Sequence, residues 1–466
     1  MRNSSWLFAT LAILAITLAA QAQSAPMQKQ APPAGGPPKP FHLPEIQRFT
    51  LPNGLHVTMV PFGSIPKVEI DVVVRAGNLN ESASQTWLAD LTGQMMKEGT
   101  TSRTSEQVAQ AAASMGGSVD VNVGPDVTTL SSDVLSEFGP KAVALLADVV
   151  RNPLLPASEL SRLKQDALRR LSIQKSQSQP LARERFVQAL YPDHPYGRLF
   201  PTEATINSFD EAAVKKFYED NFGAARTHIY VTGKFDPGAV KAAITKAFGD
   251  WKKGPDPLIQ IPKPTAHREV DLVDRPGAAQ STLYIGLATI NPSNPDFIPL
   301  QVMNALLGGS FGSRITANIR EQKGYTYSPT SQLSSRYRDA YWVEVADVTT
   351  EFTGPSIKEI LYEIDRLQKD APSSAELDGI KNYLAGVFVL RNSNRAGLSA
   401  QLQYIDLHNL GDDYLNTYVQ KVSAVTPQQV QSMAEKYIVP EKLTIVVVGD
   451  KAKVAEQIAP YEKGGE

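Results

Sequence analysis

Apolar and polar residues alternate along short runs at the start of the globular sequence. Phe49 and Leu51 precede Pro-Asn-Gly at positions 52–54, and residues 55–59 (LHVTM) follow it. This pattern predicts a β-hairpin with a tight turn. Residues 68–75 (VEIDVVVR) extend it as a further strand, whereas residues 158–176 have the spacing of an amphipathic helix. We therefore expect an α+β protein in which helices cover mostly antiparallel sheets.

A second amphipathic helix is expected within residues 87–100 (WLADLTGQMMKEGT). At about 100° per residue, its apolar face contains Leu88, Leu91, Thr92, Met95 and Met96. The opposite face contains Thr86, Asp90, Gly93, Gln94 and Lys97. Positions 90 and 94 are about one turn apart and position 93 lies beside them, so all three project the same way.

A helix followed by a strand occurs once in each half of the chain. The two copies keep one register without gaps, which favours an internal duplication over chance recurrence. Asp210 and Thr426 both occupy expected helix N-cap positions. The matching segments are residues 208–222 (SFDEAAVKKFYEDNF) with 227–232 (THIYVT), and residues 424–438 (AVTPQQVQSMAEKYI) with 443–448 (LTIVVV). A Pro-rich linker is expected at residues 254–268, between homologous domains at 44–253 and 269–461.

The N-terminal sequence predicts the cellular compartment of the protein, and the composition limits its possible partners. An apolar run that ends in Ala20-Gln21-Ala22 predicts a signal peptide at residues 1–22, followed by a Pro/Gly-rich disordered tether at 23–43. The alternative is an uncleaved anchor, but the run is shorter than the roughly 20 residues of a membrane span. We expect a periplasmic or extracellular protein with no transmembrane segment after cleavage. The absence of cysteine excludes disulfides and thiolate zinc ligands, and the net charge of −2 gives no reason to expect nucleic acid as a partner.

The helix within residues 87–100 has the geometry of a zinc-peptidase helix without its chemistry. In such helices two histidines one turn apart bind zinc, and a neighbouring glutamate acts on the bound water. The surrounding sequence, with Gly77, Glu81, Leu88-Ala89, Met95 and Gly99-Thr100, resembles the insulinase (pitrilysin-like) family of zinc peptidases. On that resemblance Asp90 and Gln94 replace the histidines and Gly93 replaces the glutamate, which makes the metal motif degenerate.

The family's third zinc ligand is a glutamate in a later long helix, and here Arg169 or Arg170 takes its place. A cation at that position opposes metal binding. Asp90 and Gln94 offer only one carboxylate and one amide to a hard cation, which is a weak site. We expect no metal and no other cofactor on this chain. Gly93 marks either the close approach of another backbone or a lost constraint.

The resemblance extends over residues 45–460, including YPDHPYGRLF at 191–200. It is most specific at residues 306–328 (LLGGSFGSRITANIREQKGYTYS), the second-domain signature. There Arg320 and Tyr327 match the family's substrate-binding pair, which can hold a peptide carbonyl and stabilise an oxyanion. From spacing alone, an arginine at a helix end and a tyrosine packed in a strand is the more ordinary arrangement.

The same loop also satisfies G-x-S-x-G around Ser310, but the residues before it have helical spacing rather than that of the strand a nucleophile elbow needs.

The resemblance implies two domains that form half of a clam-shaped chamber. It implies a non-catalytic subunit that completes the peptide-binding chamber of a homologous, zinc-bearing partner in a heterodimeric metalloendopeptidase, and the expected signal peptide makes this subunit an exported one. Zinc is then expected on the partner, and peptides are the expected substrates. The alternative is a non-hydrolytic peptide-binding protein or a structural subunit of a larger assembly.

Overall fold

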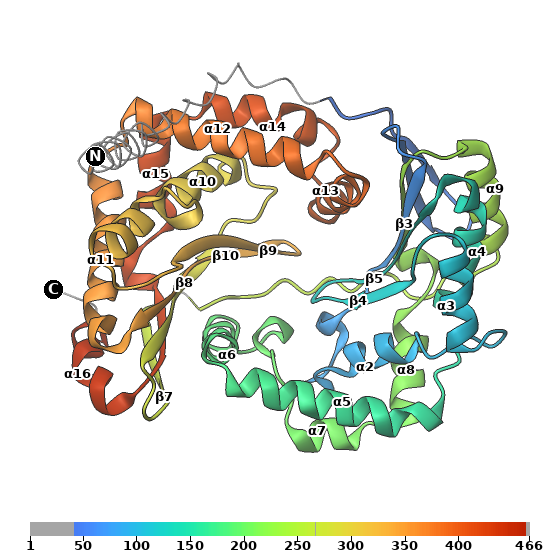
Figure 1. Ribbon diagram of the computed structural model, residues 1–466, viewed down its shortest axis with the longest axis horizontal. Coiled ribbons are helices and arrows are strands. Elements are labelled where there is room, and N and C mark those ends of the chain that lie inside the picture. The colour runs from blue at the N-terminus through green and yellow to red at the C-terminus, as the bar shows by residue number, and fades with distance from the viewer. Residues whose placement is uncertain (1–41, 266, 463–466) are drawn as a thin grey trace, which may run out of the picture. The chain divides into compact units, whose positions relative to one another are not determined.

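The computed structural model describes residues 42–265 and 267–462. The expected signal peptide, and the expected tether up to residue 41, lie outside the described residues. The described chain contains two β-sheets, each covered by helices, so the predicted α+β class is confirmed (Figure 1).

The first sheet has six strands within the described residues, and its neighbours are antiparallel except for one parallel pair, β2 with β6. The strand order is β1 (Gln47–Thr50), β2 (His56–Pro61), β6 (Thr227–Gly233), β3 (Lys67–Val74), β5 (Thr128–Leu135) and β4 (Asp120–Val123). The predicted hairpin is the β1–β2 pair, and Gly54 in its turn has φ +91°, a conformation that favours glycine.

The second sheet has five strands in the part of the chain that the structure describes, and again one parallel pair, β7 with β11. The order is β7 (Glu269–Asp274), β11 (Thr444–Gly449), β8 (Gln280–Thr289), β10 (Asp339–Thr349) and β9 (Thr330–Arg336). The strands β6 and β11 are the two copies predicted from the sequence. Each lies between one parallel and one antiparallel neighbour, as expected for a duplicated unit.

The helix that precedes each of these strands begins at the predicted N-cap. The side chain of Asp210 accepts a hydrogen bond from the N–H of Ala213, and that of Thr426 accepts one from Gln429. Such bonds satisfy N–H groups that have no partner inside the helix. The helices of the first half are α2 (Leu88–Met95), α3 (Ser105–Ser114), α4 (Gly139–Arg151), α5 (Ala157–Ser176), α6 (Ser178–Leu190), α7 (Glu203–Ser208), α8 (Glu211–Asn221) and α9 (Pro237–Phe248).

The second half continues with helices and two π-helical segments. These are α10 (Phe297–Asn304), η6 (Ala305–Gly309), η7 (Thr316–Gln322), α11 (Thr353–Lys369), α12 (Ser374–Arg391), α13 (Arg395–His408), α14 (Asp413–Ala424), α15 (Pro427–Tyr437) and α16 (Lys451–Glu462). Among the described residues, none of the helices combines the length and apolar character needed to cross a bilayer.

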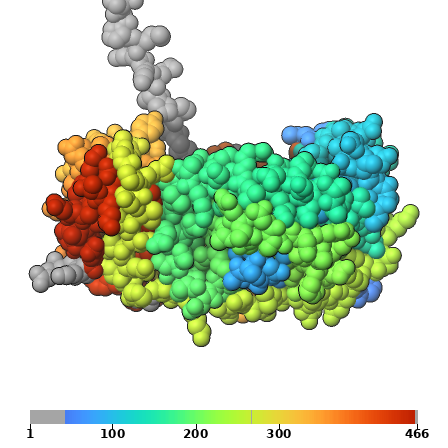
Figure 2. Space-filling view, turned by 90° about the horizontal axis from the view of Figure 1, so that it is seen from below, coloured from blue at the N-terminus to red at the C-terminus, as the bar shows by residue number. Residues whose placement is uncertain are grey.

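Each sheet is covered on one face by a helix from the other half of the chain. In β3, Val72 and Val74 belong to the same buried cluster as residues of α4, whereas Val73 belongs to the cluster that contains Leu402 of α13. Helix α13 contacts β3 and β6, and helix α6 contacts β8 and β11 of the second sheet. In Figure 2 the green surface that includes α6 meets the yellow surface of the segment around β7 and β8.

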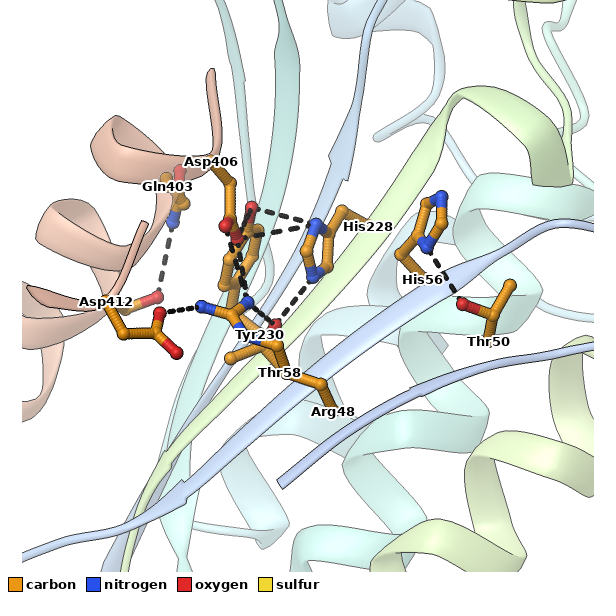
Figure 3. Close-up of polar contacts among 10 residues, drawn as sticks. Arg48, Thr50, His56, Thr58, His228, Tyr230, Gln403, Asp406 and Asp412 are labelled. Carbon is orange, nitrogen blue, oxygen red and sulfur yellow. Dashed lines mark hydrogen bonds and ion pairs between the residues drawn. The ribbon is translucent and has the colours of Figure 1, made fainter. Parts of the chain in front are cut away.

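Polar contacts fix α13 on the first sheet. The buried carboxylate of Asp71 accepts hydrogen bonds from Ser399 and from Gln403 Nε2, the latter at 3.0 Å. One turn after Gln403, Asp406 accepts a 3.0 Å bond from the hydroxyl of Tyr230 and forms a 3.2 Å ion pair with Arg48 (Figure 3). These contacts join β1, β3 and β6 to α13 through groups whose burial would be costly without partners.

His228 lies at the centre of this polar cluster. Its Nε2 is 2.7 Å from Thr58 Oγ1 and its Nδ1 is 3.0 Å from the Tyr230 hydroxyl (Figure 3). Burial lowers the pKa of His228 to about 3, so the ring is neutral near pH 7. His56 pairs with His228 across β2 and β6. The spacing of histidines along the sequence gave no sign of this proximity, because two strands bring them together.

Candidate functional site

The three positions of the degenerate metal motif lie on α2, whose first turn is held by a buried carboxylate. Glu81 accepts hydrogen bonds from the N–H groups of Trp87 and Ala89, at 3.1 and 2.8 Å. Trp87, the N-cap, has φ +73°, so the chain turns sharply into the helix. Burial raises the pKa of Glu81 to about 8 despite these bonds and one from Asn78. Glu81 thus anchors the motif helix; the sequence marked it only through the family resemblance.

Both carboxylate oxygens of Asp90 already have a partner within the chain. Asn78 Nδ2 donates to Oδ2 at 2.9 Å, and Arg170 Nη2 lies 3.2 Å from Oδ1. The guanidinium of Arg170 also stacks on the ring of Trp87, with its carbon 4.0 Å from the ring centroid. The sequence left Arg169 and Arg170 as alternatives. The structure brings Arg170 to Asp90, whereas Arg169 is exposed and pairs with Asp166.

Gly93 and Gln94 differ in their surroundings. A Cβ atom on Gly93 would lie 2.6 Å from Cγ2 of Val123 in β4, so the glycine makes room for a side chain of the strand and not for another backbone. A glutamate at that position would require Val123 to move. Gln94 is exposed and lines, with Asp90 and Leu163, a cavity of about 200 Å³ between α2 and α5.

This donor set does not suit zinc. The only carboxylate among the three motif positions is paired with a guanidinium, and the other two positions offer an amide and no side chain. Zinc sites require imidazole, thiolate or carboxylate ligands that are not already neutralised. Within residues 42–265 and 267–462, no group of three His, Cys, Asp or Glu side chains is placed to hold a metal ion.

The second-domain signature brings Arg320 and Tyr327 together. Arg320 lies near the end of η7, and its guanidinium carbon is 5.2 Å from the ring centroid of Tyr327 and 4.4 Å from that of Phe311. Tyr327 lies outside any strand and is 80 % exposed. The alternative of a tyrosine packed in a strand is therefore wrong. Arg320 Nη1 is 3.1 Å from the exposed Glu321 carboxylate, the one ion pair it makes in the described structure.

The Gly-rich loop before this pair is not a nucleophile elbow. Ser310 follows helix α10 and the π-helical segment η6, not a strand. A Cβ on Gly308 would lie 2.5 Å from a carboxylate oxygen of the buried Glu344. Gly308 therefore lets η6 approach β9 and β10, and the helix that the spacing before Ser310 predicted is confirmed.

Two family models and several curated proteins match this chain. Residues 63–201 match the insulinase (peptidase family M16) model, and residues 208–384 match the peptidase M16 inactive domain. The chain is 24% identical over 398 residues to the uncharacterized zinc protease YmxG of Bacillus subtilis, covering 84% of this chain and 95% of that protein. It is 22% identical over 429 residues to an uncharacterized zinc protease of Mycobacterium tuberculosis, covering 90% and 96%.

Solved structures share the fold. A peptidase M16 inactive domain from Pseudomonas fluorescens superposes with a TM-score of 0.80 at 24% identity, covering 87% of this chain and 98% of that chain. A protease from Helicobacter pylori gives 0.82 at 19% identity, covering 88% and 100%. The two matched models follow one another along the chain, and the second begins at residue 208, before α8 and β6 of the first half. The chain therefore belongs to the insulinase (M16) peptidase family and contains both its N-terminal and its inactive C-terminal domain.

Proposed function

We propose that the chain is the non-catalytic subunit of a two-chain peptidase and completes the peptide-binding chamber of a homologous, zinc-bearing partner. The observation that carries this proposal is the Asp90–Arg170 ion pair, which occupies the motif of the metal site. A guanidinium in that place opposes a second cation. The zinc chemistry then belongs to the partner, and this chain contributes binding.

The contribution of this chain is assigned to Arg320 and Tyr327. The arginine offers a fixed cationic fork and the tyrosine a neutral hydroxyl donor, and their side chains are in contact. Two such donors can hold a peptide carbonyl oxygen and stabilise the negative charge that develops on it. The exposure of the Tyr327 ring leaves it accessible to a peptide or to the partner subunit.

Isolation from the native source tests the assignment. We expect the tagged chain to bring with it a homologue whose motif helix retains both histidines and the glutamate, and the pair, but not this chain alone, to cleave peptides. Recovery of the chain alone or as a homodimer, with peptide bound but not cleaved, favours a non-hydrolytic peptide-binding protein. Recovery within a larger assembly without peptidase activity favours a structural subunit.

Export is part of the same proposal. The apolar run that ends in Ala20-Gln21-Ala22 supports cleavage after residue 22. The mass of the intact native protein should correspond to a chain that begins at Gln23, and a retained Met1 would contradict export by this route.

A further inference from the structure

A cavity of about 290 Å³ lies beside the degenerate metal motif and is lined by four arginines. Asp90 is the one carboxylate among its lining residues in the part of the chain that the structure describes. The arginines come from four places in the fold: Arg170 from α5, Arg183 from α6, Arg198 from the loop after α6, and Arg336 from β9. Guanidinium groups carry their charge at any physiological pH, so the lining is strongly positive.

Most of this charge has no carboxylate partner within the described residues. Arg170 pairs with Asp90. Arg198 Nη2 donates to the main-chain carbonyl of Glu81 at 2.6 Å, and Arg336 Nη1 donates to Ser334 and Ser335. Neither forms an ion pair there.

Arg183 makes no hydrogen bond or ion pair with any described residue, and its exposed side chain lines this cavity and the neighbouring one that contains Thr282 and Tyr284. Burial lowers the pKa of Arg198, which means that its charge is poorly solvated where it lies. An anion in the cavity would compensate the unpaired cations.

The wall beside the arginines is apolar and rigid. The indole of Trp87 is fixed by a 3.0 Å hydrogen bond from Nε1 to the carbonyl of Leu199, and Phe200 meets it edge to face at 6.0 Å between centroids. Arg170 stacks on the same indole ring. The cavity therefore combines an aromatic surface with guanidinium forks, which bind carboxylates through paired hydrogen bonds.

We propose that this cavity binds the carboxylate end of a peptide, with the carboxylate among Arg170, Arg183 and Arg198 and the last side chain against Trp87 and Phe200. The volume is near the lower end of the roughly 300–1,000 Å³ of ligand pockets, which suits a chain terminus rather than a long segment. All the lining residues belong to this chain, so the site does not depend on a zinc-bearing partner and goes beyond the proposed function.

Calorimetric titration of the purified chain tests the ligand class. The probes are the tripeptide Ala-Ala-Phe with a free carboxylate, the same peptide with a C-terminal amide, and inorganic phosphate. We expect the amide to bind about 10- to 100-fold more weakly than the acid, because it loses charge-assisted hydrogen bonds. Equal binding of acid and amide overturns the carboxylate site. Phosphate binding as tight as that of the peptide acid overturns the role of the aromatic wall.

Two variants that change the affinity for the peptide acid in opposite directions distinguish a loss of recognition from damage to the fold. Arg183→Gln should weaken binding of the peptide acid about tenfold or more, and leave the weak binding of the amide unchanged. Asp90→Asn should strengthen binding several-fold, because it removes the one lining carboxylate and releases Arg170 from its ion pair. Arg169→Gln is the matched control, since Arg169 is adjacent in α5 but pairs with Asp166 outside the cavity. If Asp90→Asn weakens binding, or Arg183→Gln and Arg169→Gln behave alike, the proposal is wrong.

Discussion

Restoring the three motif residues alone should not restore a metal site. The triple variant Asp90→His, Gly93→Glu and Gln94→His recreates the sequence motif on α2, with its ligands one turn apart. In the structure, however, Arg170 lies 3.2 Å from the carboxylate of Asp90 and so would stand beside any ion held at that position. The new glutamate would also need Val123 to move, because even a Cβ at position 93 lies 2.6 Å from its Cγ2.

The magnitude follows from the charges. A unit positive charge about 5 Å from a doubly charged ion costs about 2 kcal/mol at the dielectric constant of water and about 7 kcal/mol at an effective value of 20. Arg170 is partly exposed and its side chain can swing away, which favours the lower end of that range. Even about 2 kcal/mol weakens binding roughly 30-fold, and the variant still lacks a third ligand. Arg170→Glu in the triple background reverses the sign of the interaction and supplies that ligand.

Metal analysis after dialysis against dilute zinc distinguishes these cases. We expect the unmodified chain and the triple variant to hold well under one zinc per chain, and the quadruple variant with Arg170→Glu to approach one. Arg169→Glu in the triple background is the control, because it adds the same charge on the neighbouring residue of α5, which faces Asp166 instead. About one zinc per chain in the triple variant, with circular dichroism showing an intact fold, would refute the role given to Arg170.

Three further predictions concern the binding pair, the contacts of α13 and the buried Glu81. In a reconstituted complex, Tyr327→Phe should lower kcat about 10²- to 10³-fold without loss of complex formation. Arg320→Lys should lower kcat nearly as much as Arg320→Ala, because lysine lacks the planar fork. The double variant should lose less activation free energy than the sum of the two single losses. Near-normal turnover in both single variants would make the chain a scaffold. Asp406→Asn should lower the free energy of unfolding by about 1–2 kcal/mol in urea titrations, because the partly exposed Asp406 accepts a hydrogen bond from a tyrosine hydroxyl and pairs with an arginine. Asp365→Asn is the control: its ion pair on α11 is exposed, so the free energy of unfolding should change little. Because burial raises the folded-state pKa of Glu81 from 4.5 to about 8, the folded state binds more protons, and stability should fall as the pH rises from about 4.5 to 8. Glu81→Gln should remove this part of the slope in melts at pH 5 and pH 8, and an unchanged slope would contradict it.

The local elements of this protein follow from the sequence because short-range rules determine them. The turn at Gly54 and the N-caps at Asp210 and Thr426 lie where turn chemistry and capping preferences place them. The repeated helix–strand unit predicted two related sheets, and the structure shows two sheets with the same local order around β6 and β11. The degenerate motif was recognised through the family resemblance, and the helical period added that Asp90 and Gln94 project from one face.

Tertiary structure alone decided which distant groups meet. The sequence predicts a strand at residues 68–75, but not that α13, more than 300 residues later, covers one of its faces and supplies the partners of Asp71. Adjacent residues of a helix point about 100° apart, so the docking angle of α5, rather than its sequence, selected Arg170 over Arg169 as the partner of Asp90. The arginines of the cavity lie on separate elements with no common spacing. A pattern along the chain reports the periodicity of one element, whereas a site depends on how several elements pack. Their packing is determined by the burial of surfaces that are far apart in the sequence, and no short window of sequence contains both surfaces.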